Sequence, residues 1–165
     1  MDAHPSPDGV AFRRVLGQFA TGVTIVTTCL DGCYHGITVN SFCSVSLDPL
    51  LVLVCLDRKS HSLPLIAKSG VFAVNVLSHV QQEWANRFAG RGEPVTEDFA
   101  GVPHRTASTG APLLLHSLAW LDCRIVGRFD GGDHEIVLGT AVEYDLGESQ
   151  DPLLFYRGHY SRVHH

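Results

Sequence analysis

The chain has 165 residues, of which 45% are hydrophobic and 18% are charged, and its formal net charge is −5. This length predicts a single domain whose core buries roughly 70% of the surface that the unfolded chain exposes. Because the 12 lysines and arginines are few and scattered, the composition argues against a protein that binds nucleic acid.

A helix and a strand hairpin are predicted for the N-terminal part of the chain. Asp8, after Ser6 and Pro7, is a helix-start signal, and apolar residues then recur at helical spacing at Phe12, Val15, Leu16 and Phe19. Runs rich in β-branched residues follow on both sides of the Asp31-Gly32 pair, and Asp-Gly between such runs is a hairpin signal. We therefore expect two antiparallel strands within residues 22–42.

The middle of the chain alternates between apolar runs and short helical segments. Residues 49–56, PLLVLVCL, are typical of a strand that is covered on both faces. A short helix opened by Ser60 or Ser62 and closed by Gly70 is expected next, followed by a strand over residues 71–77. Residues 78–90 predict a second helix that ends at Gly90, with one face formed by Val80, Trp84 and Phe88.

Two long strands complete the predicted fold. Residues 90–112 are rich in Gly, Pro, Ser and Thr and predict a long surface excursion. Residues 117–129 alternate as a strand does. One face carries Ala119, Leu121, Cys123 and Ile125, and the other face carries Trp120, Asp122 and Arg124. Residues 134–146 alternate likewise, with a shared face of Ile136, Leu138, Val142, Tyr144 and Leu146. With the turn DGGD between them, these strands form a hairpin, and the total of five to seven mostly antiparallel strands predicts a β-barrel-like α+β domain.

The features that the sequence lacks exclude several classes of protein. Its longest apolar runs fall short of the ~20 residues of a membrane-spanning helix, and its polar N-terminus lacks a signal peptide, so we expect no membrane partner and a cytoplasmic location. The five cysteines lack CxxC spacing and indicate free thiols, and the group Cys29, Cys33 and His35 lacks a second pair of ligands, so no metal is expected. Phosphate-loop, Rossmann, zinc-protease and hydrolase motifs are absent, so any catalysis depends on a bound cofactor or on a site assembled from loops.

Six segments occur together in the order and spacing of a known family: FRRVLGQFATGVTIVTT, GITVNSFCSVSLDPLLVLVCLDRKSHS, FAVNVLS, RFAG, GGDHEIVLG and PLLFYRGHY. Over residues 12–160 the chain resembles the short-chain flavin reductases, an FMN-binding split-barrel group that includes the reductase components of two-component flavin monooxygenases. Residues 1–11 and 161–165 are then tails. The resemblance implies a mainly β, α+β fold with a six-stranded antiparallel split β-barrel and a few short helices, and it implies a homodimer.

The resemblance also implies an activity. It is hydride transfer from NADH or NADPH to FMN or FAD, with the reduced flavin released to a partner monooxygenase. The sequence leaves open whether FMN or FAD is used, because both flavins share the ring, the ribityl chain and the first phosphate. It also leaves open whether NADH or NADPH is used, because no motif for binding the 2′-phosphate of NADPH is recognisable.

The resemblance places the flavin ring and ribityl chain along one polar segment, where short side chains let the backbone approach the ring closely. The segment comprises Thr38, Val39, Asn40, Ser41, Phe42 and Cys43, with Ser46 nearby. The end of the next strand, at Cys55, Leu56 and Asp57, is implied to lie against the flavin as well.

The resemblance places the phosphate at the following turn, where Ser60, His61 and Ser62 combine hydroxyl groups with the start of a helix. In related sequences the position of His61 is often Arg, so charge neutralisation here is assigned to Arg58, Lys59 or Arg87. Arg87 and Phe88 match the next flavin contact of the family, although simple packing on a helix face explains Phe88 equally well.

His134 is the candidate residue closest to the chemistry. It matches a family histidine that meets the nicotinamide, and it is expected to orient that ring, because direct hydride transfer needs no general base. Near the C-terminus, Tyr156, Arg157 and Gly158 are implied to contact the dinucleotide, with Tyr160 packing beside them.

Two alternatives to a flavin reductase remain open from the sequence. One is a flavin-binding or electron-transfer domain of the same fold that accepts electrons from a protein and has no enzymatic activity of its own. The other is a structural or ligand-sensing split barrel that takes up no flavin.

Overall fold

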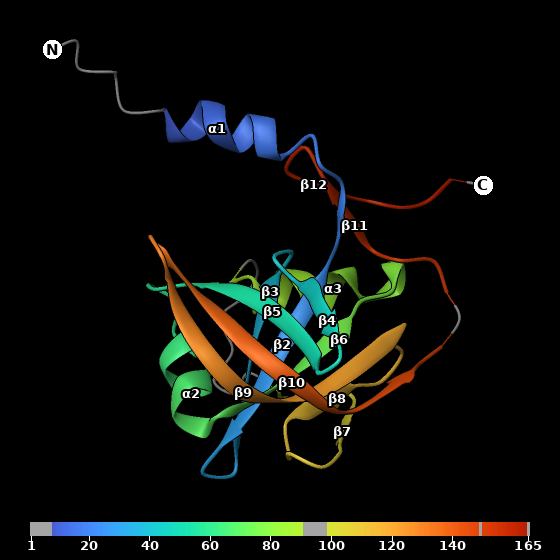
Figure 1. The fold of residues 1–165 in the computed structure, drawn as a ribbon. Coiled ribbons are helices and arrows are strands. Elements are labelled where there is room, and N and C mark those ends of the chain that lie inside the picture. The colour runs from blue at the N-terminus through green and yellow to red at the C-terminus, as the bar shows by residue number, and fades with distance from the viewer. Residues whose placement is uncertain (1–7, 91–98, 149, 165) are drawn as a thin grey trace, which may run out of the picture.

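The computed structural model describes residues 8–90, 99–148 and 150–164, and the described chain is mainly β, with every strand pair antiparallel (Figure 1). The main sheet has seven strands in the order β3-β2-β6-β9-β10-β5-β4. Its strands are β2 (Thr24–Leu30), β3 (Cys33–Val39), β4 (Cys43–Leu47), β5 (Leu50–Asp57), β6 (Val71–Val76), β9 (Ala119–Gly131) and β10 (His134–Leu146). The prediction of a mainly β, α+β domain is therefore confirmed, whereas the main sheet has seven strands instead of the six that the resemblance implied.

Two small sheets accompany the main sheet. One joins β1 (Thr21–Gly22), β11 (Leu154–Tyr156) and β12 (His159–Ser161) in the order β1-β11-β12. The other pairs β7 (His104–Thr106) with β8 (Pro112–Leu114) inside the predicted surface excursion. Part of that excursion, residues 91–98, lies outside the described residues, as do residues 1–7 of the predicted N-terminal tail.

The helices are short, and they differ in what they contact. They are α1 (Gly9–Leu16), α2 (Ser62–Ser69), the 3-10 helix η1 (His79–Gln81) and α3 (Gln82–Phe88). The N-cap of α1 is Asp8, whose side chain accepts a hydrogen bond from the backbone N–H of Val10 at 2.9 Å. None of the α1 residues is buried, and the helix stands apart from the main sheet (Figure 1). Val80 is 59% exposed because it lies in η1, so its predicted place on the apolar face of a single helix was wrong.

Both predicted hairpins are present. Asp31 and Gly32 take positive φ angles of 52° and 77° at the tight turn between β2 and β3, as a two-residue hairpin turn requires. The turn between β9 and β10 contains Gly132 with a φ of 76°. In the part of the chain that the structure describes, no helix has the length and hydropathy needed to cross a membrane.

The predicted alternation holds in β9 from Ala119 to Ile125 but fails in β10. In β9, Leu121, Cys123 and Ile125 pack in the main core, whereas Trp120 packs in a separate cluster, and the pairing with β6 has no register shift. In β10 the register shifts between Ala141 and Glu143, so the predicted shared face is broken there, with Ile136 and Leu138 on one face and Tyr144 and Leu146 on the other. Asp122 is accommodated inside because the backbone N–H of Thr109 donates to its carboxylate at 2.8 Å and the hydroxyl of Thr109 donates a second bond.

The main sheet curls so that its two edge strands meet. β3 and β4 lie at opposite ends of the strand order, yet only Asn40, Ser41 and Phe42 separate them along the chain. The hydroxyl of Ser41 fixes this corner to β5, because it donates to the carbonyl of Cys55 at 2.8 Å and accepts from the N–H of Cys55 at 3.0 Å. Inside the curl, the main core packs α2 against the sheet through Val26, Val54, Leu56, Ile66 and Phe72. The corner of residues 40–42 is therefore attached directly to a strand of the main core.

Candidate functional site

Three cavities follow one another along β3 and the corner that leads into β4. The first has a volume of about 270 Å³ and is lined on β3 by Gly36 and Ile37. The second, of about 120 Å³, is lined by Thr38, Val39 and Asn40, and the third, of about 660 Å³, is lined by residues 40–44. A cavity of several hundred Å³ is typical of small-molecule sites, so the row offers a large compartment at one end and a polar one at the other.

The largest cavity contains predicted flavin residues and a segment that the sequence analysis missed. Asn40, Ser41, Phe42 and Cys43 line one side, as predicted, and residues 19–22 line the other. That second segment, FATG, belongs to one of the six quoted motifs, and its position inside such a motif is the signal that pointed to it. Asn40, Cys43 and Phe19 are exposed at this cavity, and Phe42 packs partly against the core.

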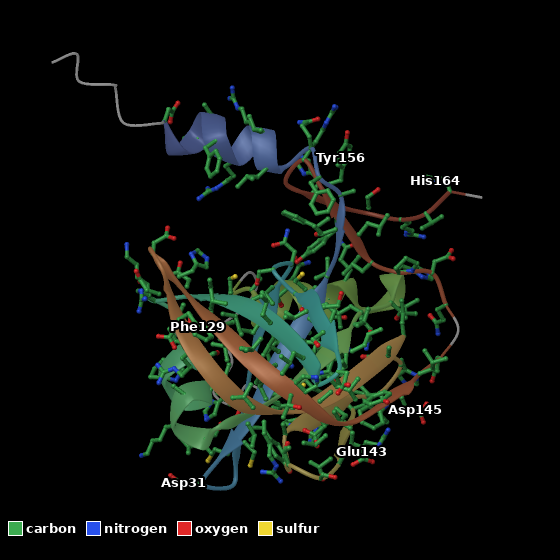
Figure 2. All side chains as sticks on the ribbon, in the orientation of Figure 1. Asp31, Phe129, Glu143, Asp145, Tyr156 and His164 are labelled. Carbon is green, nitrogen blue, oxygen red and sulfur yellow. The ribbon has the colours of Figure 1, made fainter. Side chains whose placement is uncertain are left out.

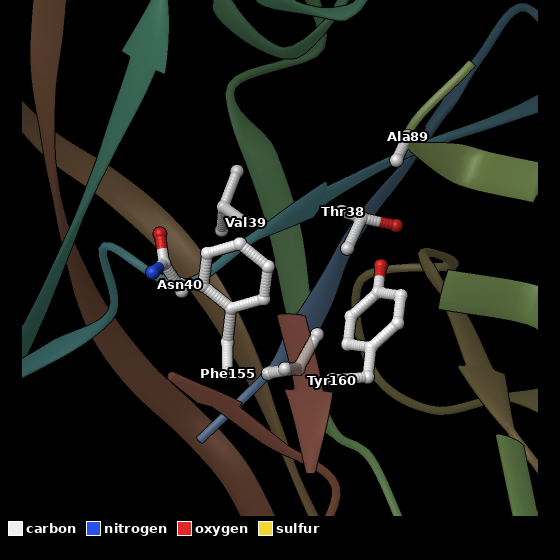
Figure 3. Close-up of a pocket in the computed structure, with 7 residues that line it drawn as sticks. Thr38, Val39, Asn40, Ala89, Phe155 and Tyr160 are labelled. Atoms are coloured by element: carbon white, nitrogen blue, oxygen red, sulfur yellow. The ribbon is translucent and has the colours of Figure 1, made fainter. Parts of the chain in front are cut away.

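The middle cavity lies between β3 and the small sheet of β1, β11 and β12. Figure 3 shows the rings of Phe155 and Tyr160 facing Thr38, Val39 and Asn40. These two aromatic residues pack edge to face, with ring centroids 5.7 Å apart. Of the predicted partners of the dinucleotide, Tyr156 ends β11, and Arg157 and Gly158 form the turn between β11 and β12.

That turn faces α1. The backbone N–H of Arg157 donates to the carbonyl of Gly17 at 2.9 Å, and its Nε donates to the side chain of Gln18 at 3.0 Å. Figure 2 shows Tyr156 at the end of α1, away from the strands of the main sheet. The contact of residues 156–158 with the dinucleotide stays a prediction.

The hydroxyl groups of the polar segment are mostly engaged inside the protein. Thr38 donates to the carbonyl of Ala85 in α3 at 2.7 Å, and Ser41 is bonded to Cys55. The side chain of Asn40, in contrast, makes no hydrogen bond to any residue within the described ranges. Ser46 accepts from the N–H of Asp48 at 3.2 Å on the edge strand β4 and lines none of the three cavities. Asn40 is therefore the side chain of this segment that is left to bind a ligand.

The first cavity gathers the predicted phosphate residues. Ser60, His61 and Ser62 line it together with Arg87 and Phe88, although Arg87 follows Ser60 by 27 positions in the sequence. Ser62 donates to the carbonyl of Gly36 at 3.2 Å, and Ser60 accepts from the N–H of Leu63 in the first turn of α2 at 3.2 Å. We call residues 57–62 the phosphate turn.

The cations predicted for this place differ in their contacts. Arg87 lines the cavity and donates from Nη1 to the carbonyl of Ala100 at 2.9 Å. Arg58 turns away from the cavity, because its Nε donates to the carbonyl of Gly132 at 2.9 Å and its Nη2 pairs with Asp130 at 2.6 Å. Arg58 is therefore engaged by the β9–β10 hairpin.

His134 shares one face of the sheet with several predicted flavin residues. It pairs across the ladder with Asp57, while Ile136 pairs with Cys55, and cross-strand partners project to the same face. Cys43 pairs with Leu53, which lies four residues before Asp57, so His134 and Cys43 are offset by about 13 Å in the strand direction, at 3.3 Å per residue, and lie on strands that flank β5. The side chain of Leu56 points to the opposite face and is fully buried, so only its backbone is available to a ligand.

The titratable groups on this face affect one another. His134 Nδ1 donates to the carboxylate of Asp133 at 2.7 Å, and this hydrogen bond lowers the pKa of Asp133 below its ordinary value. Burial raises the pKa of the Cys55 thiol, and the neighbouring Cys43 raises it further. Cys55 is therefore a neutral, weakly polar surface at neutral pH, which suits the face of an uncharged aromatic ring.

The residues present fit a flavin. The large cavity supplies the free amide of Asn40 beside the thiol of Cys43, and the first cavity supplies hydroxyl groups, an imidazole and the Arg87 guanidinium for a phosphate. Phe155 and Tyr160 add aromatic surface between these two ends. The donor set thus changes from amide and thiol to hydroxyl and cation along the row, as the parts of a flavin mononucleotide do.

Comparisons with known proteins agree with this arrangement. The family model for the flavin reductase like domain matches residues 16–164. The reductase subunit HsaB of a flavin-dependent monooxygenase from Rhodococcus jostii is 44% identical over 152 residues, which cover 92% of this chain and 76% of that protein. A flavin reductase from Pseudomonas putida is 43% identical over 150 residues, covering 90% of this chain and 86% of the relative.

Solved structures show the same fold. The flavin reductase PheA2 in its native state aligns with a TM-score of 0.89 and 39% identity, covering 96% of this chain and 100% of that one. The Streptomyces globisporus NADH:FAD oxidoreductase SgcE6, in complex with NAD and FAD fragments, aligns with a TM-score of 0.88 and 36% identity over 95% of this chain and 93% of its own. Since the family model spans nearly the whole described fold and these relatives match over most of their length, the chain belongs to the flavin reductase like domain family.

Proposed function

We propose that the protein is an NAD(P)H-dependent flavin reductase that supplies reduced flavin to a partner monooxygenase. The observation that carries the proposal is the row of three cavities along β3, in which predicted flavin residues from distant parts of the sequence meet. The relatives support it, since HsaB is named as the reductase subunit of a flavin-dependent monooxygenase and SgcE6 was solved with NAD and FAD fragments. These relatives are enzymes, which favours the reductase over a flavin-binding protein without catalysis.

The protein's own residues have distinct tasks in this proposal. A bound flavin accepts a hydride from the nicotinamide, and this direct transfer depends on close positioning of the two rings. Asn40 provides hydrogen bonds to the ring system, and Ser60, Ser62 and Arg87 hold the phosphate. His134, with 42% of its side chain exposed and its Nδ1 bonded to Asp133, orients the nicotinamide from the same face of the sheet.

The proposed assembly is a homodimer. The apolar residues of α1 are uncovered in the single chain, and Phe19 after it is 78% exposed. On the main sheet, the face that carries Leu146 and Tyr144 is also exposed, and Leu47 on the edge strand is 88% exposed. An eight-residue helix is not stable in water without packing, so α1 needs a partner surface. A two-fold dimer buries both apolar surfaces, because the α1 helix of each chain covers the exposed sheet face of its partner chain.

Steady-state oxidation of NADH and NADPH, each with added FMN and FAD, tests the proposed activity and measures both preferences in one set of assays. We expect turnover that depends on added flavin. Absence of turnover with all four combinations would reject the proposal. Stopped-flow mixing of flavin-loaded protein with NADH separates the reductase from an electron-transfer protein, since only the reductase bleaches the flavin directly.

The cytoplasm remains the proposed location. The five cysteines are all free thiols, and a reducing compartment maintains that state.

A further inference from the structure

Arg58 begins beside the phosphate turn, but its contacts run to the turn of the β9–β10 hairpin. Its backbone N–H donates to the carbonyl of Asp133 at 3.0 Å, and its Nε donates to the carbonyl of Gly132 at 2.9 Å. These two carbonyl groups belong to the residues immediately before His134. Arg58 therefore fixes the backbone that leads into the candidate nicotinamide residue.

The guanidinium of Arg58 also pairs with carboxylates on both sides of the same turn. Its Nη2 lies 2.6 Å from Asp130, and its Nη1 lies 3.5 Å from Glu135. Glu135 is largely buried and also accepts a hydrogen bond from Arg128. All three nitrogens of the Arg58 side chain are thus engaged by residues 130–135, which leaves the phosphate to other cations.

The hairpin turn needs such an anchor. Gly132 has a φ of 76° and follows Gly131 at the end of β9, so the backbone there has little intrinsic preference for one conformation. Among the described residues, the ring of His134 is hydrogen-bonded only to Asp133, whose carbonyl accepts from the backbone N–H of Arg58. The side chain of Arg58 adds the contact to the carbonyl of Gly132 and so holds the turn that leads into Asp133 and His134.

We propose that Arg58 is a positioning residue whose side chain fixes the turn before His134 and so the orientation of the His134 imidazole, while the ladder pairing of His134 with Asp57 fixes the backbone spacing between the nicotinamide end and the phosphate end of the site. The proposal rests on the proposed flavin reductase function. Arg58 touches neither the flavin nor the nicotinamide, and it acts through the hairpin turn and His134.

A matched pair of substitutions tests this role. Arg58→Gln and Arg128→Gln each remove one guanidinium from Glu135, but only Arg58→Gln releases the carbonyl of Gly132. The measurements are the Kd of NAD⁺ for the FMN-loaded protein by calorimetry, the KM for NADH, and the Kd of FMN by fluorescence quenching. We expect Arg58→Gln to raise the first two by about tenfold or more, since small misplacements of a substrate have effects of that size. The Kd of FMN should change less than twofold, and Arg128→Gln should leave all three values within twofold.

A second comparison uses the double variant Arg58→Gln/His134→Ala. If Arg58 acts through His134, adding Arg58→Gln to His134→Ala should raise the Kd of NAD⁺ less than twofold, far below its effect in the wild-type protein. An equal effect in both backgrounds would overturn the proposal. Equal effects of Arg58→Gln and Arg128→Gln on the Kd of NAD⁺ would also overturn it, because they would assign Arg58 to neutralising Glu135. A rise in the Kd of FMN as large as the rise in the Kd of NAD⁺ would overturn it as well, because it would make Arg58 a phosphate ligand.

Two controls keep the outcome decisive. Thermal unfolding of each variant shows whether it folds, and if Arg58→Gln does not, the pair Arg58→Lys and Arg128→Lys replaces it, because lysine keeps the charge but cannot reproduce the planar fork of contacts. A wild-type protein that fails to oxidise NADH in the presence of flavin would reject the proposed function itself. The Kd of NAD⁺ in the variants would still report separately on Arg58.

Discussion

At the level of single residues, the polar segment of residues 38–43 contains side chains that stabilise the fold and one side chain that is available to bind a flavin. Thr38 and Ser41 use their hydroxyl groups to fasten β3 to α3 and the corner to β5. Asn40 lies between them and lines both the middle and the large cavity. The two kinds of residue therefore respond differently to substitution.

Asn40→Ala should weaken flavin binding without destabilising the protein. The loss of one or two hydrogen bonds to the ring, at about 1 kcal/mol each, raises the Kd about fivefold to thirtyfold. Fluorescence quenching of FMN measures the Kd. Ser41→Ala serves as the contrast, because it leaves two backbone groups of Cys55 unpaired and should lower the free energy of unfolding by about 1–3 kcal/mol. If Asn40→Ala loses as much stability as Ser41→Ala, the assignment of Asn40 is wrong.

His134→Ala should raise the KM for NADH and lower kcat while the Kd of FMN changes less than twofold. The physical reason is that His134 lies on the same sheet face as Cys55 but lines none of the three cavities that hold the predicted flavin residues. Steady-state kinetics measure the KM and kcat, and a flavin titration measures the Kd of FMN.

A second histidine provides the control for His134. His116 Nδ1 also contacts a carboxylate, that of Glu148, at 2.6 Å, but His116 lies between β8 and β9, outside the β5–β10 pairing that holds His134. Its φ is 68°, so His116→Asn is the suitable substitution, because Asn tolerates that backbone. It should leave KM and kcat unchanged. A parallel loss of flavin affinity in His134→Ala would instead make His134 a flavin ligand.

At the level of elements, the sequence predicted most strands and turns correctly, because their signals are local. The Asp31-Gly32 turn and the long hairpin after residue 117 follow from turn chemistry and β-branched runs that need no distant partner. The predicted faces of β9 were correct over residues 119–125, but the shared face predicted for β10 was wrong, since the bulge after Ala141 depends on pairing between strands. The burial of Asp122 was also not predictable, because Thr109 satisfies its carboxylate and no local pattern reveals that partner.

The site was predictable to the extent that motifs carried it. The quoted segments identified Asn40, Ser60 and Arg87, which the fold brings to one row of cavities. The sequence did not reveal that Arg58 faces the hairpin, or that Phe155 lines the middle cavity beside Tyr160. Both facts depend on how β5 and β11 are placed by the tertiary fold.

The α1 helix leads to a prediction about assembly. Phe12→Ser combined with Leu16→Ser should convert the proposed dimer to a monomer, because it removes apolar surface that only a second chain covers. Sedimentation velocity measures the mass of the assembly. Arg14→Ser on the same helix is the control and should keep the dimer. A wild-type protein that sediments as a monomer at tens of micromolar, or a double variant that stays dimeric, would contradict this prediction.

At the level of the whole molecule, one buried thiol makes stability depend on pH. Burial, and to a smaller extent the neighbouring Asp122 carboxylate, together raise the pKa of Cys123 from the ordinary thiol value of 9.0 to about 12. The unfolded chain therefore loses this proton at a lower pH than the folded protein does. Since the folded state then binds more protons, the free energy of unfolding falls as the pH rises from about 9 towards about 12.

At pH 10 this group alone should lower the free energy of unfolding by about 1.4 kcal/mol relative to pH 8. Urea unfolding at pH 8, 9 and 10 measures the change. Other groups also titrate in this range, so the comparison is with Cys123→Ala, which lacks the contribution and should show a shallower decline. Equal slopes in the two proteins would show that the Cys123 thiol does not differ between the folded and unfolded states.

The middle cavity has a mechanical consequence for the whole molecule. It is bounded by β3 of the main sheet on one side and by Phe155 and Tyr160 of the small sheet on the other (Figure 3). A ligand that spans the row of cavities would therefore join two sheets that share no strand, and would act as a brace between them. Backbone amides of β11 and β12 should then exchange with deuterated water more slowly once flavin is bound, although neither strand belongs to the main sheet.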